Sequence, residues 1–323
     1  MNFDRCLFYF FWAIDHLSQL PKDKQIFASQ RARLHRRLTN QNPKRNVFHP
    51  VEERHVSFLS KTDMDRLPTD RPLVFRGLAN QSSVIKKWDF DYFKNRYKNT
   101  TQPFFKNIDG RVEMDFFSVK EGLEKIIQEN PSHSYLGGPF DLINVDHSLR
   151  ADLELEKIID QRFFKNKFTL LYKLFFAGKG QSALVHSEFG AVLNILAKGK
   201  KRWLLFRPED SPLLKPDVSR TIFLRSELYS KASILRNQDF GIEAWEVSVE
   251  EGDVLYFPCY FWHYVENEDN AVSVEFKWGS IQMLFRNFFL TALLLTARNP
   301  SLLGQFARIR NPSIKPSPDV FNN

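Results

Sequence analysis

The chain has 323 residues, which is enough for one large domain or two smaller domains with a sizeable core. Hydrophobic residues make up 43% and charged residues 26%, a balance that is ordinary for a globular protein. The two cysteines, Cys6 and Cys259, lie far apart without a framework spacing, which argues against a disulfide-stapled secreted domain. We therefore expect a cytoplasmic protein in a reducing compartment.

Positive charge is concentrated at the two ends of the chain. Residues 1–50 carry a net charge of +6 and residues 281–323 a net charge of +4, out of +8 for the whole chain. Such ends can meet nucleic acid, an anionic membrane surface or an acidic protein. Simple solubility is the plainer explanation.

Residues 1–65 are expected to form a basic helical segment that becomes irregular. Apolar side chains recur at helical spacing near its start: Phe3, Leu7, Phe10, Phe11, Ile14 and Leu17. Asp15 and His16 interrupt this apolar run, and no small-residue cleavage site follows it. The run therefore predicts an amphipathic helix rather than a signal peptide.

Between residues 66 and 280, short apolar runs alternate with turn signals. In chain order, the first elements that we expect are a strand at 73–75, a helix at 84–97, an extended piece from 104, a helix at 116–128, a short strand at 134–136, a loosely helical stretch at 141–161 and a strand at 168–176. Further strands are expected at 182–185, 191–196, 202–206, 245–249, 254–257 and 271–276. The strands at 191–196 and 202–206 are expected to form a hairpin around Gly199. Residues 208–240 lack clean periodicity and form a long connection. The pattern indicates a mainly β core with flanking helices.

A short apolar helix is expected near the end of the chain. Residues 288–297 are strongly apolar, but Arg286 and Arg298 flank them closely. The run falls well short of the ~20 residues that a membrane span needs, so we expect no transmembrane segment. We interpret it as a buried or dimer-forming helix, with interfacial membrane binding as the alternative.

Two motifs, far apart in the sequence, carry candidate metal ligands. The first is the run from Leu184 to Glu188, in which His186 and Glu188 stand two apart and would point to the same side of a strand. The second begins with a Gly-Asp turn and an apolar strand at 252–258 and ends at His263, which could reach the first motif across a barrel. Two imidazoles and one carboxylate leave coordination positions open, as in non-haem Fe(II) oxygenases. Ordinary surface or core histidines are the alternative, because a lone H-x-E tripeptide is a weak signal.

These motifs resemble those of the JmjC/cupin-type 2-oxoglutarate oxygenases, and most closely the subgroup of the factor-inhibiting-hypoxia-inducible-factor asparaginyl hydroxylase. The resemblance is carried by residues 185–188, 199–208 and 252–263, with weaker echoes at 72–78, 88–93 and 135–136. It implies a double-stranded β-helix (jelly-roll) catalytic domain at 66–280. The basic helical segment 1–65 would precede this domain. A helical tail, 281–323, would follow it and could form a homodimer.

The resemblance also implies the cofactors and the residues that hold them. His186, Glu188 and His263 would bind Fe(II), which takes 2-oxoglutarate and O2 and couples decarboxylation to hydroxylation of a C–H bond. Lys201 would bind the far carboxylate of 2-oxoglutarate, and it shares strand parity with the apolar residues two and four positions later. Tyr135 and Ser182 would supply hydroxyl groups to the cosubstrate. Each of these residues also has a plainer interpretation. Lys201 could be a lysine in an exposed turn, Tyr135 a tyrosine of the core and Ser182 a serine in a turn.

The sequence departs from the subgroup at four positions. Glu188 replaces the usual Asp, Val192 and Leu196 stand in place of Asn and Gln, and Glu275 replaces an Asn. The two apolar replacements put the usual cosubstrate pose and substrate in doubt. A buried carboxylate such as Glu275 would have to be paired, and two lysines, Lys173 and Lys277, could do so.

The function that these features favour is an Fe(II)- and 2-oxoglutarate-dependent oxygenase that hydroxylates a protein side chain or another macromolecule. One alternative is a small-molecule oxygenase of natural-product biosynthesis, and another is a tRNA-modifying oxygenase. A third is a non-catalytic cupin that uses its basic ends to hold RNA or an acidic partner, with an affinity that falls steeply with salt.

Overall fold

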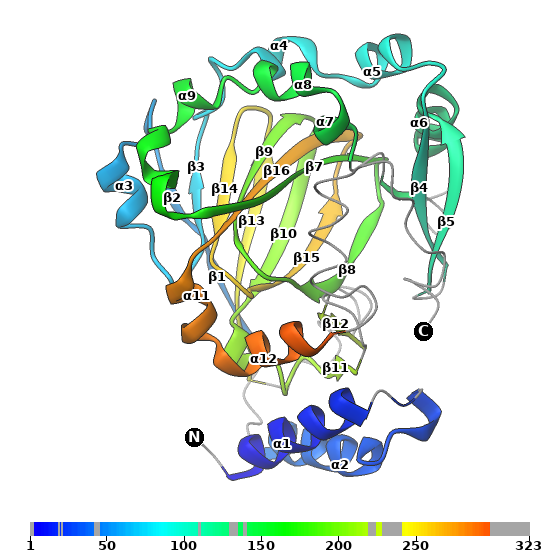
Figure 1. The fold of residues 1–323 in the computed structure, drawn as a ribbon, viewed down its shortest axis with the longest axis vertical. Helices are drawn as coiled ribbons and strands as arrows, with labels where there is room; N and C mark the ends of the chain where they lie inside the picture. Colours follow the sequence, from blue (N-terminus) through cyan, green and yellow to red (C-terminus); the bar gives the residue numbers. More distant parts are fainter. Residues whose placement is uncertain are drawn as a thin grey trace.

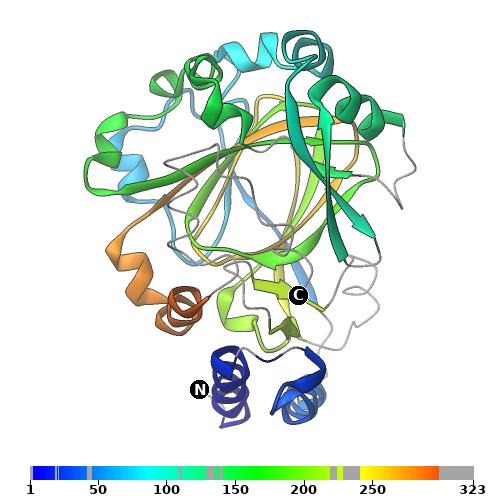
Figure 2. The same ribbon diagram turned by 45° about the vertical axis from the view of Figure 1, so that its right-hand side comes forward.

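The computed structural model describes residues 3–18, 20, 22–41, 46–108, 111–128, 135–137, 141–218, 224–227 and 241–297 (Figure 1). Its centre is a pair of facing β-sheets, wrapped by helices (Figure 2). The larger sheet has the order β1 (Val47–Pro50), β13 (Glu243–Glu250), β10 (Lys200–Phe206), β15 (Trp262–Asn267), β8 (Ser182–Ser187), β12 (Leu224–Ser226) and β11 (Pro216–Asp217). The second sheet has the order β2 (Glu52–Arg54), β3 (Leu73–Phe75), β14 (Val254–Phe257), β9 (Ala191–Lys198), β16 (Ala271–Gly279) and β7 (Phe168–Ala177). A small third sheet has the order β5 (Arg111–Ser118), β4 (Thr101–Ile108) and β6 (Tyr135–Gly137).

Successive strands of the core alternate between the two large sheets, except that β10 and β13 lie in the same sheet and pair with each other. Strands β7, β9, β14 and β16 lie in the six-stranded sheet, whereas β8, β10, β13 and β15 lie in the seven-stranded sheet. This alternation winds the chain into a double-stranded β-helix and confirms the expected jelly-roll core with flanking helices.

The prediction of a hairpin around Gly199 is wrong. Strands β9 and β10 do not pair with each other, because the chain turns a corner there and passes from one sheet to the other. Gly199 has a φ of +88°, and a Cβ atom at this position would lie 2.2 Å from the Asn270 carbonyl oxygen. Only glycine fits this corner without strain.

Three apolar clusters hold the layers together. The lumen cluster fills the space between the two large sheets and includes Val192, Leu196, Trp203, Leu205 and Phe257. A second cluster joins the outer face of the six-stranded sheet to the helices shown across the top of Figure 1: α4 (Ser83–Lys87), α5 (Phe90–Arg96), α6 (Val119–Gln128), α7 (Leu142–Val145), α8 (His147–Asp152) and α9 (Leu155–Ile158). The third joins the seven-stranded sheet to α1 (Phe3–Ser18), α2 (Ala28–Gln41) and α12 (Phe288–Thr296) at the opposite end. The remaining helices among the described residues are α3 (Lys61–Asp65), α11 (Ile281–Arg286) and the 3-10 turns at Lys22–Lys24, Gln161–Asn166 and Pro208–Asp210.

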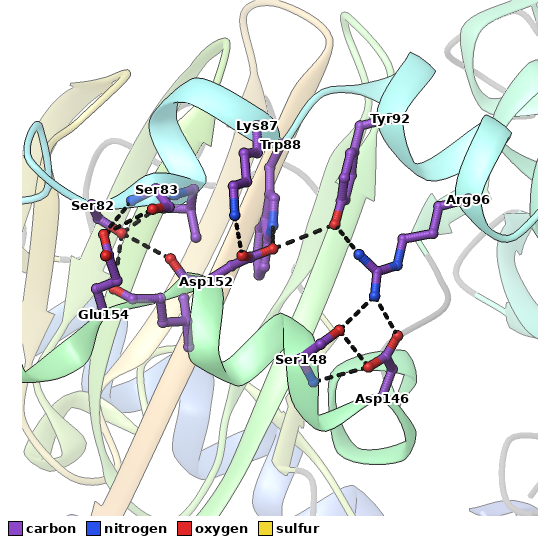
Figure 3. Close-up of polar contacts among 12 residues, drawn as sticks. Ser82, Ser83, Lys87, Trp88, Tyr92, Arg96, Asp146, Ser148, Asp152 and Glu154 are labelled. Atoms are coloured by element: carbon purple, nitrogen blue, oxygen red, sulfur yellow. Dashed lines mark hydrogen bonds and ion pairs between the residues drawn. The ribbon is translucent and has the colours of Figure 1, made fainter.

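Polar contacts tie α4 and α5 to α8 (Figure 3). The Asp152 carboxylate accepts hydrogen bonds from Lys87 Nζ at 2.6 Å, from Trp88 Nε1 at 3.3 Å and from the Tyr92 hydroxyl at 3.4 Å. Asp146, which caps the start of α8, accepts from Arg96 at 3.0 Å. These contacts fix the helical cover on the outer face of the six-stranded sheet.

Local details differ from the sequence-based expectations. The helix expected at 84–97 is broken into α4 and α5, because Asp89 caps α5 by accepting a hydrogen bond from the Tyr92 amide at 2.7 Å. In the segment expected to be helical and then irregular, β1 and β2 pair in parallel with β13 and β3. The helix expected from residue 116 begins at Val119, after β5 ends. The connection 208–240 and the tail beyond residue 297 lie partly or wholly outside the described residues.

Cys6 and Cys259 are both free thiols. None of the helices among the described residues is long and apolar enough to cross a membrane.

Candidate metal centre

Two neighbouring strands bring the candidate histidines together. His186 lies near the end of β8 and His263 near the start of β15, and the two are direct partners in the antiparallel register. Their ring centroids are 4.1 Å apart. Glu188 follows immediately after β8, and one ligand atom from each of the three residues lies within 4.8 Å of the other two. The long-range pairing of β8 with β15 therefore assembles a set of ligands from two distant parts of the sequence.

Hydrogen bonds orient both imidazole rings. The Nδ1 atom of His186 lies 2.7 Å from the Leu184 carbonyl oxygen, and Nδ1 of His263 lies 3.1 Å from the Phe261 carbonyl oxygen. Because a carbonyl oxygen only accepts, each Nδ1 carries the proton and donates it. Each Nε2 atom then keeps a free lone pair, which is the arrangement that metal-binding histidines adopt.

Burial keeps both histidines in the form that binds metals. It lowers the pKa of His263 to about 4 and holds the pKa of His186 well below its usual range, with the neighbouring imidazole adding to the effect on His186. Both rings are therefore neutral at pH 7. Aromatic rings close around them, with Phe257 5.0 Å and Trp203 6.0 Å from His263 between centroids. This apolar surrounding lowers the effective dielectric constant and so strengthens the attraction between the ligands and a cation.

Two lysines hold the carboxylate of Glu188. Lys173 Nζ lies 3.1 Å from Oε2, and Lys277 Nζ forms an ion pair with Oε1. Lys277 is only 2% exposed at its side chain and also lies 3.2 Å from Oε2 of Glu275. The expected pairing of Glu275 with a lysine is thus met by Lys277. Burial and Lys173 lower the pKa of Lys277, and burial raises the pKa of Glu275.

Lys201 lies deep in the lumen, which confirms its expected inward direction. It is 4% exposed and lies on the same face of β10 as Trp203 and Leu205, both members of the lumen cluster. Its Nζ atom donates a hydrogen bond to Ser273 Oγ at 2.6 Å. Burial lowers its pKa from the usual 10.5 to about 8, and Glu275 partly opposes this change.

Ser182 points away from the lumen, contrary to the role expected for it. It pairs with Glu266, which in turn pairs with Arg202, and the Arg202 side chain is 40% exposed on the outer face. An irregularity between the His263 and Val265 pairs shifts the register of β8, so the alternation that places His186 inward does not extend to Ser182. Tyr135 lies in β6 and pairs with Lys106, but its side chain is outside the described part of the chain.

Strand β16 supplies polar groups that the sequence analysis left out or placed only in part. Ser273, Glu275 and Lys277 alternate with apolar residues and share the inward face, opposite Leu196, Asn194 and Val192 of β9. Ser273 and Asn194 were not anticipated as lumen residues. The sequence pattern that could have predicted polar groups in the lumen is the strict polar–apolar alternation of residues 272–278. Such alternation is unusual for a strand that is buried throughout.

A jelly-roll that brings two histidines and a carboxylate together within ligand distance defines a cupin-type protein with a candidate mononuclear metal centre. Comparison with known proteins agrees, because the chain belongs to the cupin-like domain family, whose model matches residues 60–282. The resemblance to the JmjC/cupin-like oxygenases is thereby confirmed, whereas the asparaginyl hydroxylase subgroup stays a prediction.

Several curated proteins are similar to part of the chain. HSPB1-associated protein 1 of Homo sapiens is 29% identical over 193 residues, which is 51% of this chain and 38% of that protein. Its Rattus norvegicus counterpart is 33% identical over 195 residues, covering 53% of this chain and 40% of the relative. JmjC domain-containing protein 8 of Mus musculus is 29% identical over 107 residues, covering 33% and 37%. The chain thus matches about two fifths of the length of these relatives.

Proposed function

We propose that the protein is an Fe(II)- and 2-oxoglutarate-dependent oxygenase. The observation that carries this proposal is the convergence of His186, Glu188 and His263, with both histidine Nδ1 atoms engaged and both Nε2 atoms available. This donor set suits Fe(II) and leaves positions for a cosubstrate and O2. Membership of the cupin-like family, and relatives such as JmjC domain-containing protein 8, support the same chemistry.

Each residue of the proposed site has a distinct task. His186, Glu188 and His263 hold the metal, and when bound, Fe(II) with 2-oxoglutarate and O2 supplies the oxidising power that hydroxylates a C–H bond. Lys201 binds the far carboxylate of 2-oxoglutarate, because a buried lysine whose hydrogen-bond partner is a neutral serine is stabilised by an incoming anion. Tyr135 is proposed to assist it on the resemblance alone. The aromatic lumen wall orients the cosubstrate and excludes water.

The substrate proposed for the site is a protein side chain or another macromolecule. The name of HSPB1-associated protein 1 says that this relative associates with a protein, which supports contact with a polypeptide. Small molecules and RNA are the alternatives. Their discrimination requires a substrate screen in which hydroxylation is detected as a mass increase of one oxygen atom.

The decisive test is iron- and 2-oxoglutarate-dependent release of succinate. The purified chain is reconstituted anaerobically with Fe(II), exposed to air with 2-oxoglutarate, and compared with His186→Ala. We expect succinate from the wild type and none above background from the variant, with unchanged circular dichroism. A folded wild type that binds neither Fe(II) nor Mn(II) would contradict the proposal.

A non-catalytic cupin is the second candidate, and the contacts of Glu188 favour it. Both carboxylate oxygens are held by lysines, which compete with a metal for this ligand. This candidate predicts no succinate release under any metal. It also predicts RNA binding that weakens steeply with salt and is unchanged by His186→Ala.

The proposed domain organisation keeps a catalytic domain at 66–280 between a basic segment, 1–65, and a C-terminal segment, 281–323. Homodimerisation through the C-terminal helices is proposed because α11 and α12 expose large apolar side chains. Phe285 is 72% and Phe288 70% exposed.

A further inference from the structure

Each oxygen of the Glu188 carboxylate is contacted by an amino group from the opposite sheet. Lys277 on β16 contacts Oε1, and Lys173 on β7 contacts Oε2 at 3.1 Å. A metal ion needs at least one of these oxygens. The metal and the amino groups compete for the same oxygens, so loading of the centre is favoured when an amino group withdraws from Glu188. Lys277 has a second carboxylate within reach.

Glu275 offers Lys277 a second acceptor. Its Oε2 atom lies 3.2 Å from Lys277 Nζ, yet it accepts no hydrogen bond from any residue that the structure describes, although it is buried. Glu275 and Lys277 stand two apart on β16, so their side chains share the lumen face. A change in the side-chain torsions of Lys277 can move its amino group from Glu188 to Glu275. The backbone need not move.

We propose that the Lys277 amino group competes with a metal ion for the Glu188 carboxylate, and we call this role the guard of the metal centre. Without metal, Lys277 holds Glu188 in place beside the two histidines, and on metal binding it transfers to Glu275 and releases the ligand. Glu275 is thus the acceptor that makes loading feasible. This inference rests on the proposed function, because it assumes that Glu188 is a metal ligand.

The guard sets the metal affinity of the protein. An amino group on a ligand oxygen competes with the metal for the same lone pairs, and its positive charge repels a divalent cation in a dry site. Groups adjacent to metal ligands typically change metal affinity by about 10- to 100-fold. Removal of Lys277 should accordingly tighten metal binding. Removal of Glu275 should weaken it, because Lys277 then loses the nearby carboxylate that can take it from Glu188.

The test measures Mn(II) affinity by calorimetry and by electron paramagnetic resonance, without 2-oxoglutarate. We expect Lys277→Met to bind Mn(II) about tenfold more tightly than the wild type and Glu275→Gln to bind it several-fold more weakly. Lys198→Met is the matched control, since it removes one lysine from β9 that pairs with Glu251 at 3.0 Å on the exposed side. It should leave the affinity unchanged. Lys277→Gln repeats the measurement with a polar side chain if the methionine variant does not fold.

A double-mutant cycle separates the guard from a simple electrostatic effect of Glu275. If Glu275 acts by receiving Lys277, the loss of affinity caused by Glu275→Gln disappears when Lys277 is already Met. If Glu275 acts only through its charge, the loss is the same in both backgrounds, and the relay is refuted.

Two further outcomes are distinguishable. A wild type that binds Mn(II) through His186, together with a folded Lys277→Met variant of equal or lower affinity, overturns the guard but leaves the oxygenase proposal standing. Absence of Mn(II) binding in the wild type and in every variant overturns the proposed function itself. Binding that appears only after Lys277→Met supports the guard but contradicts the proposal that the wild type is an iron-dependent oxygenase.

Discussion

Lys201→Met tests whether the lumen is built to receive an anion. Burial lowers the Lys201 pKa from 10.5 to about 8, which corresponds to about 3 kcal/mol of destabilisation of the folded protein when the lysine is charged in both states. Methionine removes this cost but leaves Ser273 Oγ without its donor, a loss of about 1 kcal/mol. The variant should therefore be more stable than the wild type by about 2 kcal/mol at pH 7 in the absence of ligands.

The pH dependence follows from the direction of the pKa change. A lysine whose pKa is lowered by folding reduces the free energy of unfolding, and this reduction is complete below about pH 8. The reduction becomes smaller as the pH rises towards 10.5, because the lysine then becomes neutral in the unfolded as well as in the folded protein. At about pH 9.5 this destabilisation falls to about half of its value at pH 7, so Lys201→Met should be hardly more stable than the wild type. Urea unfolding at both pH values measures the difference, with Lys198→Met as the exposed-lysine control.

The same variant should lose its response to 2-oxoglutarate. In the wild type loaded with Mn(II), 2-oxoglutarate should raise the melting temperature, since a ligand that binds only the folded state stabilises it. In Lys201→Met this increase should be absent. A variant that is less stable than the wild type at pH 7, or a stability difference that does not change with pH, would refute the reasoning.

Three further substitutions test local packing in the fold and the proposed dimer interface. Gly252→Ala should destabilise the protein by at least about 2 kcal/mol in urea unfolding, because Gly252 has a φ of +89° and a Cβ atom there would lie 1.8 Å from Asn80 Oδ1; wild-type stability would contradict this. Asp152→Ala removes the acceptor of three side-chain hydrogen bonds from α4 and α5 and should cost about 2 kcal/mol, with Mn(II) affinity unchanged. Phe288→Arg should convert a dimer into monomers in light scattering, and it is a cleaner test than a change at Leu293, which is buried within the protomer. An unchanged mass would argue against the proposed interface.

Much of the lumen could be inferred from local sequence patterns. The inward direction of Lys201 followed from its parity with Trp203 and Leu205, because strand side chains alternate regularly. That rule failed at Ser182, where an irregularity in the β8–β15 register reversed the parity. A bulge depends on the partner strand, so no pattern within β8 could reveal it.

The sequence patterns by themselves determined a mainly β core with flanking helices and the identity of three candidate ligands, since periodicity and residue chemistry are local properties. The jelly-roll class came from the resemblance to a known family. Only the tertiary structure decided that β9 and β10 form a corner between sheets. It alone also placed Lys277 on Glu188, 89 positions away in the chain. Both features arise from long-range strand pairing, whose register is set by how whole sheets pack and not by the residues of any one segment.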